Sequence, residues 1–177
     1  MRIIAIVSIC LTLTLQAKSQ SVFKSSFADE ANFLNPSKTI ELIDSIGKSI
    51  LTYNKEGLVF KNKKYHFIRH KRNIYLTDSF ATNSIGSIRR SMRSFSFDGN
   101  EYRISKRGRS GYNFVIRDKS NNIISFVKFS TIKNVNNIEI LHIGNYNLLP
   151  FVFLVTLGEL NNHKGLMNLV FFLWLFP

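Results

Sequence analysis

The chain has 177 residues, which is enough for one domain with a substantial core, and it carries a formal net charge of +13. Hydrophobic residues make up 45% of it and aromatic residues 13%, a composition that excludes an intrinsically disordered protein. Its one cysteine is Cys10, so no intramolecular disulfide can form and stability must come from the core.

Residues 1–19 are predicted to be a secretory signal. Arg2 supplies the positive start, residues 3–15 form an apolar stretch, and Ala17-Lys18-Ser19 offers small residues at the positions that determine cleavage. Cleavage is therefore expected after Ser19, leaving a mature chain without cysteine. An uncleaved anchor remains the alternative. Either way the protein is expected to be exported, as a periplasmic, cell-surface or secreted protein, and it could also associate with a membrane.

Residues 20–56 are interpreted as a lead-in followed by an amphipathic helix over residues 37–51. Pro36 stands near the expected first turn. Apolar residues then recur at three- and four-residue spacing, which is typical of one helix face: Ile40, Ile43, Ile46 and Ile50. This helix is expected to pack on the rest of the domain as a lid or to hold a partner.

From residue 57 the hydrophobic period changes to two, which predicts short strands bounded by turn-forming residues. Asp98-Gly99-Asn100 is a strong hairpin signal because glycine tolerates a positive φ. Regular short strands with tight turns predict an antiparallel sandwich or barrel. The expected strands are 58–61, 65–70, 73–77, 85–89, 93–98, 101–105, 112–118, 123–129 and 137–143.

Two apolar runs follow the predicted strands. The first predicts a helix over residues 148–160 that is apolar on all sides, so it must be buried. The second, residues 166–176 within a tail of residues 164–177, is shorter than the roughly 20 residues of a membrane-spanning helix. It is expected to associate with a surface or a membrane, with Trp174 as an interfacial anchor. Packing on the outside of the domain is the alternative.

This pattern of strands, acidic turns and a closing apolar helix over residues 57–163 resembles the tubby C-terminal-like superfamily, which includes LURP-one-related proteins and phospholipid scramblases. The segments that carry the resemblance are Ile85-Gly86-Ser87-Ile88, Phe97-Asp98-Gly99-Asn100-Glu101-Tyr102-Arg103-Ile104, Tyr112-Asn113-Phe114-Val115-Ile116-Arg117-Asp118, Asn122-Ile123-Ile124-Ser125-Phe126-Val127 and Ile138-Glu139-Ile140. The resemblance implies a mainly β protein, a closed antiparallel barrel of short strands around an apolar C-terminal helix. It also implies phosphoinositide binding in eukaryotic relatives.

Motifs of common enzyme classes are absent, which weighs against nucleotide enzymes, zinc proteases and α/β-hydrolases. His66 and His70 are four residues apart, and on a strand this places them about 13 Å from each other, too far to share one metal ion. No catalytic residue, metal or cofactor is expected, and the protein is predicted not to be an enzyme. A small secreted hydrolase or nuclease that uses one of these histidines remains an alternative.

Positive charge is concentrated in residues 55–133, which contain eighteen Lys and Arg but five Asp and Glu. Such an excess favours polyanions: lipid head groups, nucleic acid or cell-wall polymers. The leading hypothesis is a non-enzymatic exported barrel that binds anionic lipid or another polyanion; a membrane-anchored structural protein is the alternative. The candidate anion-binding residues are Arg89, Arg90, Arg93, Arg103, Lys106, Arg107 and Arg109.

Overall fold

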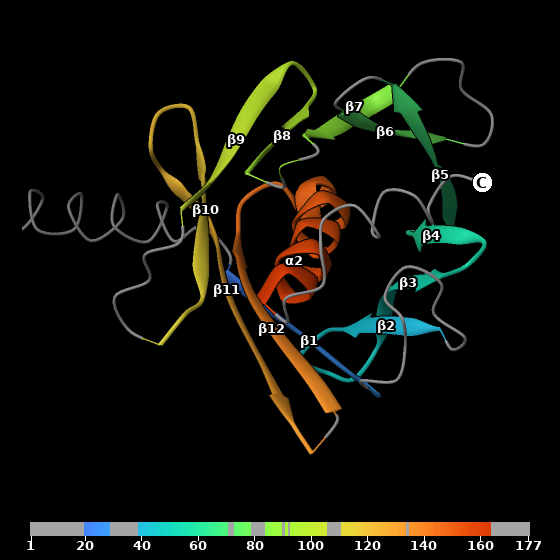
Figure 1. Cartoon of the computed structure of the whole chain (residues 1–177), viewed down its shortest axis with the longest axis vertical. Helices are drawn as coiled ribbons and strands as arrows, with labels where there is room; N and C mark the ends of the chain where they lie inside the picture. The colour runs from blue at the N-terminus through green and yellow to red at the C-terminus, as the bar shows by residue number, and fades with distance from the viewer. Residues whose placement is uncertain are drawn as a thin grey trace, which may run out of the picture.

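The computed structural model describes residues 20–28, 39–70, 73–78, 84–89, 91, 93–105, 111–133 and 135–163. Twelve strands in this part of the chain form a closed antiparallel barrel around one helix (Figure 1). The elements are β1 (Gln20–Ala28), β2 (Ile40–Ile43), β3 (Ser49–Asn54), β4 (Gly57–Phe60), β5 (Lys63–His70), β6 (Asn73–Asp78), β7 (Ser84–Arg89), β8 (Ser94–Phe97), β9 (Asn100–Ser105), β10 (Phe114–Asp118), β11 (Ile123–Ile132), β12 (Val135–Ile143), a 3-10 turn η1 (Tyr146–Leu148) and α2 (Leu149–His163).

Each strand pairs with its neighbour in the chain, and β1 closes the circuit by pairing with both β12 and β2. The β1–β12 register runs from Gln20 opposite Ile143 to Ala28 opposite Val135. The β1–β2 pairing consists of one bridge, Lys24 opposite Ile43. β1 is therefore paired along its whole length with β12, but with β2 through a single bridge.

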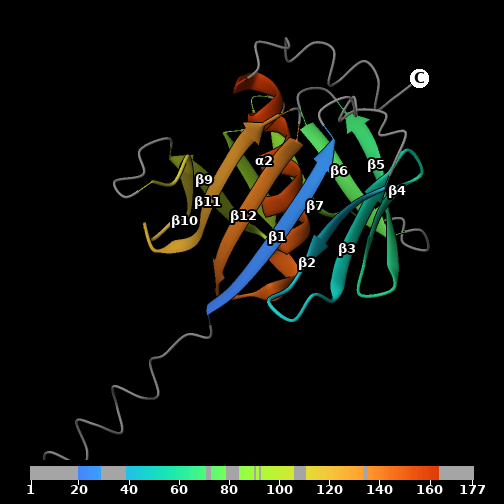
Figure 2. The same ribbon diagram turned by 90° about the horizontal axis from the view of Figure 1, so that it is seen from below.

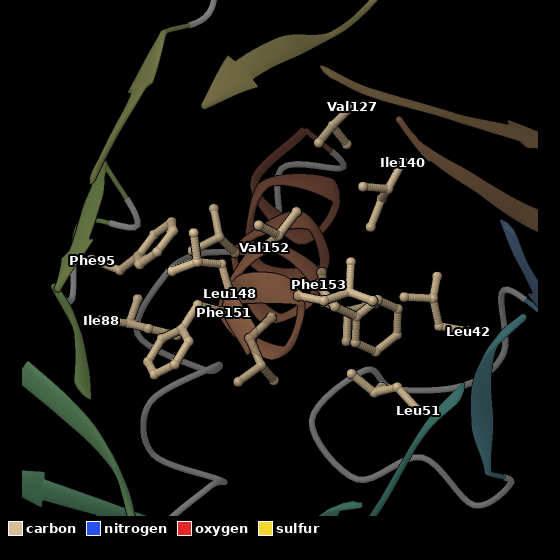
Figure 3. Packing of buried hydrophobic residues seen from close by; sticks show 14 of the residues in the cluster. Leu42, Leu51, Ile88, Phe95, Val127, Ile140, Leu148, Phe151, Val152 and Phe153 are labelled. Carbon is tan, nitrogen blue, oxygen red and sulfur yellow. The ribbon is translucent and has the colours of Figure 1, made fainter. Parts of the chain in front are cut away.

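Helix α2 runs through the middle of the barrel (Figure 2). Every residue from Phe151 to Leu160 is buried, which is what a helix that is apolar on all sides requires. Side chains from opposite walls converge on it: Leu42 and Leu51 lie on the side of Phe153, whereas Ile88 and Phe95 lie near Phe151 (Figure 3). The core of the domain is thus the layer between the helix and the inward side chains of the strands.

The closed barrel and its enclosed C-terminal helix confirm the predicted fold class. All nine predicted strands are present, with shifted ends. The predicted hairpin turn is present too, with a φ of 48° at Asp98 and 71° at Gly99, the left-handed values that such a turn needs. The expected C-terminal helix over residues 148–160 corresponds to η1 and α2, and the tail 164–177 lies outside the described residues.

The predicted amphipathic helix over residues 37–51 is wrong, because described residues 39–51 form β2, a turn and the start of β3. Ile40 and Leu42 face the core at strand spacing. The turn is built by Asp44, whose Oδ1 accepts the backbone N–H groups of Ile46 at 3.0 Å and Lys48 at 2.9 Å. The barrel also begins at Gln20 rather than at residue 57.

Candidate anion-binding site

A row of polar side chains crosses the outer wall of the barrel from β5 to β10. Side chains of a strand point alternately to its two faces, and the neighbours Ile74, Ile88, Phe95, Tyr102 and Ile116 are buried in the core. The residues next to them therefore point away from the core, and all of them except Ser94, which is 6% exposed, are at least partly exposed. We call this set the basic row; its members are His70, Asn73, Arg89, Ser94, Arg103 and Arg117.

Strand register places the members of the basic row side by side. His70 is opposite Asn73, and Asn73 is opposite Arg89. Arg103 lies between Ser94 on one side and Arg117 on the other. Ile88 on β7 is paired with Phe95 on β8. Arg89 follows Ile88 and Ser94 precedes Phe95, so Arg89 and Ser94 are neighbours across the same two strands. Six consecutive strands thus contribute one residue each.

One carboxylate lies between two of the guanidinium groups. Glu101 Oε1 is 3.5 Å from Arg89 Nη2, and Glu101 Oε2 is 3.8 Å from Arg103 Nη2. The two arginine side chains are 65% and 73% exposed. Ion pairs this long and this exposed contribute little to stability because water and salt screen them. Both guanidinium groups consequently remain accessible to an anion from solution.

Arg117 on β10 is opposite Arg103 in the strand register. Its Nη1 donates a hydrogen bond of 2.8 Å to the backbone carbonyl of Asn121, which anchors the side chain to the β10–β11 turn. Like charges placed directly opposite each other on adjacent strands destabilise a sheet. The three arginines together with Glu101 carry a formal charge of +2, so an oxyanion bound here would relieve repulsion as well as gain attraction.

Hydroxyl groups line the wall next to the basic row. Ser87 Oγ and Ser96 Oγ are 2.9 Å apart, and Asn73 Nδ2 donates to Tyr75 Oη at 3.3 Å. Tyr75, Ser87 and Ser96 also border a surface hollow of about 540 Å³. Hydroxyl hydrogens can rotate toward an acceptor, so these groups can supply neutral hydrogen bonds to an anion held by the arginines.

The structure describes three of the seven predicted site residues. Arg89 and Arg103 both belong to the basic row. Arg93 is exposed in the turn before β8, where its carbonyl accepts the backbone N–H of Ile104 at 2.9 Å. The other four lie outside the described residues: Arg90, Lys106, Arg107 and Arg109. Arg117 was missed by sequence reasoning, because only strand register places it beside Arg103.

The histidines of the described part lie on β5, on β12 and at the end of α2. His66 and His70 are exposed on β5, as their strand spacing indicates, and no group of three or more metal-binding side chains occurs among the residues described. His142 is buried, with Nδ1 2.7 Å from Ser125 Oγ and Nε2 2.9 Å from the carbonyl of Asn145. Burial lowers its pKa, although the hydrogen bond to Asn145 opposes the shift.

Ser125 is fully buried as well, so its hydroxyl group cannot meet a substrate in this conformation. The Nε2–H of His142 can donate only to the Asn145 carbonyl, which leaves Nδ1 to accept the Ser125 hydroxyl hydrogen. This pair therefore joins β11 and β12 to the segment that leads into the helix. Its geometry is that of a structural link and not of an accessible nucleophile.

Comparisons with known proteins leave the site to be interpreted from its geometry. Neither the protein-family models, nor the curated proteins, nor the solved structures include a match to this chain. In the part of the chain that the structure describes, no helix has both the length and the apolar character needed to cross a bilayer. Among the described residues, the charged and polar side chains of the basic row are therefore the candidate site.

Proposed function

We propose that this protein is a non-enzymatic barrel domain that binds anionic lipid or another polyanion through the basic row. The observation that carries the proposal is the placement of Arg103 opposite Arg117 in the strand register, with Arg89 two strands from Arg103 and Glu101 between Arg89 and Arg103. Such an arrangement costs stability in the absence of an anion. Its exposed guanidinium groups are suited to phosphate, sulfate or carboxylate oxygens.

We also infer that the chain belongs to the tubby C-terminal-like superfamily. The closed barrel of twelve antiparallel strands around an apolar C-terminal helix supports this assignment. Export is part of the same proposal. β1 begins at Gln20 and is paired from that residue onward, so cleavage after Ser19 would leave every described strand whole. The ligand of an exported domain would be a lipid surface or a polymer outside the cytoplasm.

Binding assays with a charge-reversed variant test the proposal. Arg103→Glu with Arg117→Glu should abolish most binding to anionic liposomes and to a soluble polyanion at low salt. The matched control is Lys48→Glu with Lys55→Glu, which makes the same change in net charge at exposed turns flanking β3. If the interaction is specific to the row, the control keeps most of its affinity.

Salt titration adds a second readout to the same assay. Counter-ion release predicts that log Kd rises with log salt concentration, with a slope close to the number of ionic contacts. The row variant should therefore show a slope lower by about two. Equal losses in the row variant and in the control would show that net charge alone attracts the polyanion, and the proposed site would then be wrong.

A further inference from the structure

The basic row bends around the barrel. Its members come from six of the twelve strands, and the three arginines lie on β7, β9 and β10. β7, β8, β9 and β10 follow one another around α2 in Figure 1. Three steps in a circuit of twelve strands turn the wall through about 90°. The side chains of Arg89 and Arg117 therefore leave the barrel in clearly different directions.

The length of the row exceeds that of a single phosphate group. Neighbouring strands are about 4.8 Å apart, so the path from His70 to Arg117 measures about 24 Å along the wall. A small anion could bridge Arg89 and Arg103, as the Glu101 carboxylate does, but not also reach Arg117, whose guanidinium group is bonded to the carbonyl of Asn121. A flat bilayer touches a convex wall along a narrow line, so it too would engage only part of the row.

From this curvature we infer that the ligand of the basic row is a flexible linear polyanion that lies across the strands and follows the wall from Arg117 past Arg103 to Arg89. The inference rests on the proposed function, since it names the ligand of the same site. A chain with oxyanion groups repeated along it can bend with the wall and meet all three guanidinium groups. It would displace Glu101 from Arg89 and Arg103 as it binds.

The neutral groups of the row agree with such a ligand. Ser94, a short and buried side chain, separates Arg89 from Arg103, and Asn73 continues the row beyond Arg89. The row contains no phenylalanine, tyrosine or tryptophan, so stacking of nucleic-acid bases would depend on His70 or on Tyr75 beside Asn73. The three arginines are directed at the charged backbone of the polymer. Inorganic polyphosphate is the simplest probe with this chemistry.

Affinity as a function of chain length tests the inference. The full chain is titrated at one salt concentration with tripolyphosphate, with long-chain polyphosphate at equal total phosphate, and with anionic vesicles. Long chains should bind at least tenfold more tightly per phosphate than tripolyphosphate, because additional contacts form within one complex. Vesicles should bind more weakly than the long polymer.

Single substitutions show whether one polymer contacts the whole row. Arg89→Gln and Arg117→Gln should each weaken long-chain binding by about fivefold and lower its salt slope by about one. Tripolyphosphate binding should fall in Arg89→Gln, because a short anion can replace Glu101 between Arg89 and Arg103, and stay nearly unchanged in Arg117→Gln. Lys48→Gln removes the same charge from the β2–β3 turn and should leave every ligand unaffected.

The outcomes separate this inference from the proposed function. If affinity does not depend on chain length, or if vesicles bind more tightly than long polyphosphate with the same arginine dependence, the linear ligand is wrong while the anion site remains. If none of the three probes binds in a manner that depends on these arginines, the proposed function is wrong as well.

Discussion

Gly86 is the position where the barrel wall approaches the central helix most closely among the described glycines. A Cβ atom placed on Gly86 would lie 2.7 Å from Phe151 Cζ and 2.9 Å from Phe151 Cε1, and it would also meet the backbone carbonyl of Ser96. Ordinary contacts between carbon atoms begin near 3.5 Å. The Phe151 ring cannot retreat freely, because it stacks on Phe95 and meets Phe97 edge-on, each with ring centroids 5.5 Å away.

Gly86→Ala should therefore lower the free energy of unfolding by about 1–3 kcal/mol, the usual cost of overpacking a core. Each kcal/mol corresponds to about 2–4 °C in Tm for a chain of this size. Urea unfolding followed by circular dichroism measures the effect. Phe151→Leu removes the ring carbons that clash, so Gly86→Ala should cost less in that background, although the contact with the Ser96 carbonyl persists. Additive effects of the two substitutions would refute this account of the helix–wall contact.

Three further results are expected. Phe153→Asp places an unpaired charge at a fully buried position, which costs several kcal/mol; a cooperative unfolding transition by circular dichroism would contradict its enclosure by the barrel. Glu101→Gln removes the internal competitor of the polyanion, so polyphosphate should bind several-fold more tightly at low salt while Tm changes little, and weaker binding would mean that Glu101 orients the arginines instead. Burial lowers the pKa of His142 in the folded state, so the unfolded chain is protonated at this histidine at a higher pH than the folded chain. The free energy of unfolding should therefore fall as the pH decreases below about 6.5. In urea titrations between about pH 7 and pH 5, His142→Gln should lack this pH-dependent loss of stability.

Much of the fold can be predicted because local signals agree with the global arrangement. β12 alternates strictly between buried and less buried residues, in β9 Tyr102 faces the core and Arg103 faces solvent, and Asp98-Gly99 allows one turn geometry. The apolar surface of α2 on all sides requires enclosure, and a closed barrel provides it. These features depend on residues that are close together in the sequence.

The first three strands were missed for physical reasons. β1 contains Ser25 at an inward position between Phe23 and Phe27, which weakens its apolar alternation. In β2 and β3 the isoleucines also fit the spacing of an amphipathic helix, and short segments cannot be assigned by periodicity alone. Pairing with β12 across more than 100 residues is what makes β1 a strand, and local patterns do not contain that information.

The candidate site was predicted only in part for a related reason. The sequence shows basic residues in clusters, and Arg89 and Arg103 were identified in this way. Arg117 is the one basic residue of β10 and comes fourteen positions after Arg103, and only the β9–β10 register brings the two together. In β10 the three residues Phe114 to Ile116 are all apolar and buried, so no alternation marks Arg117 as an outward residue, and the register was needed to place it beside Arg103.

Binding of a polyanion on the outer wall from β7 to β10 can be located residue by residue. The most direct measurement is a titration of the isotope-labelled protein with long-chain polyphosphate, monitored by NMR at the backbone amides and the guanidinium Nε–H groups. Shifts should concentrate at Arg89, Arg103 and Arg117 and at the hydroxyl residues between them, with the turns around β3 unchanged. Shifts spread evenly over all lysines and arginines, or centred on β1 to β4, would contradict the proposed site.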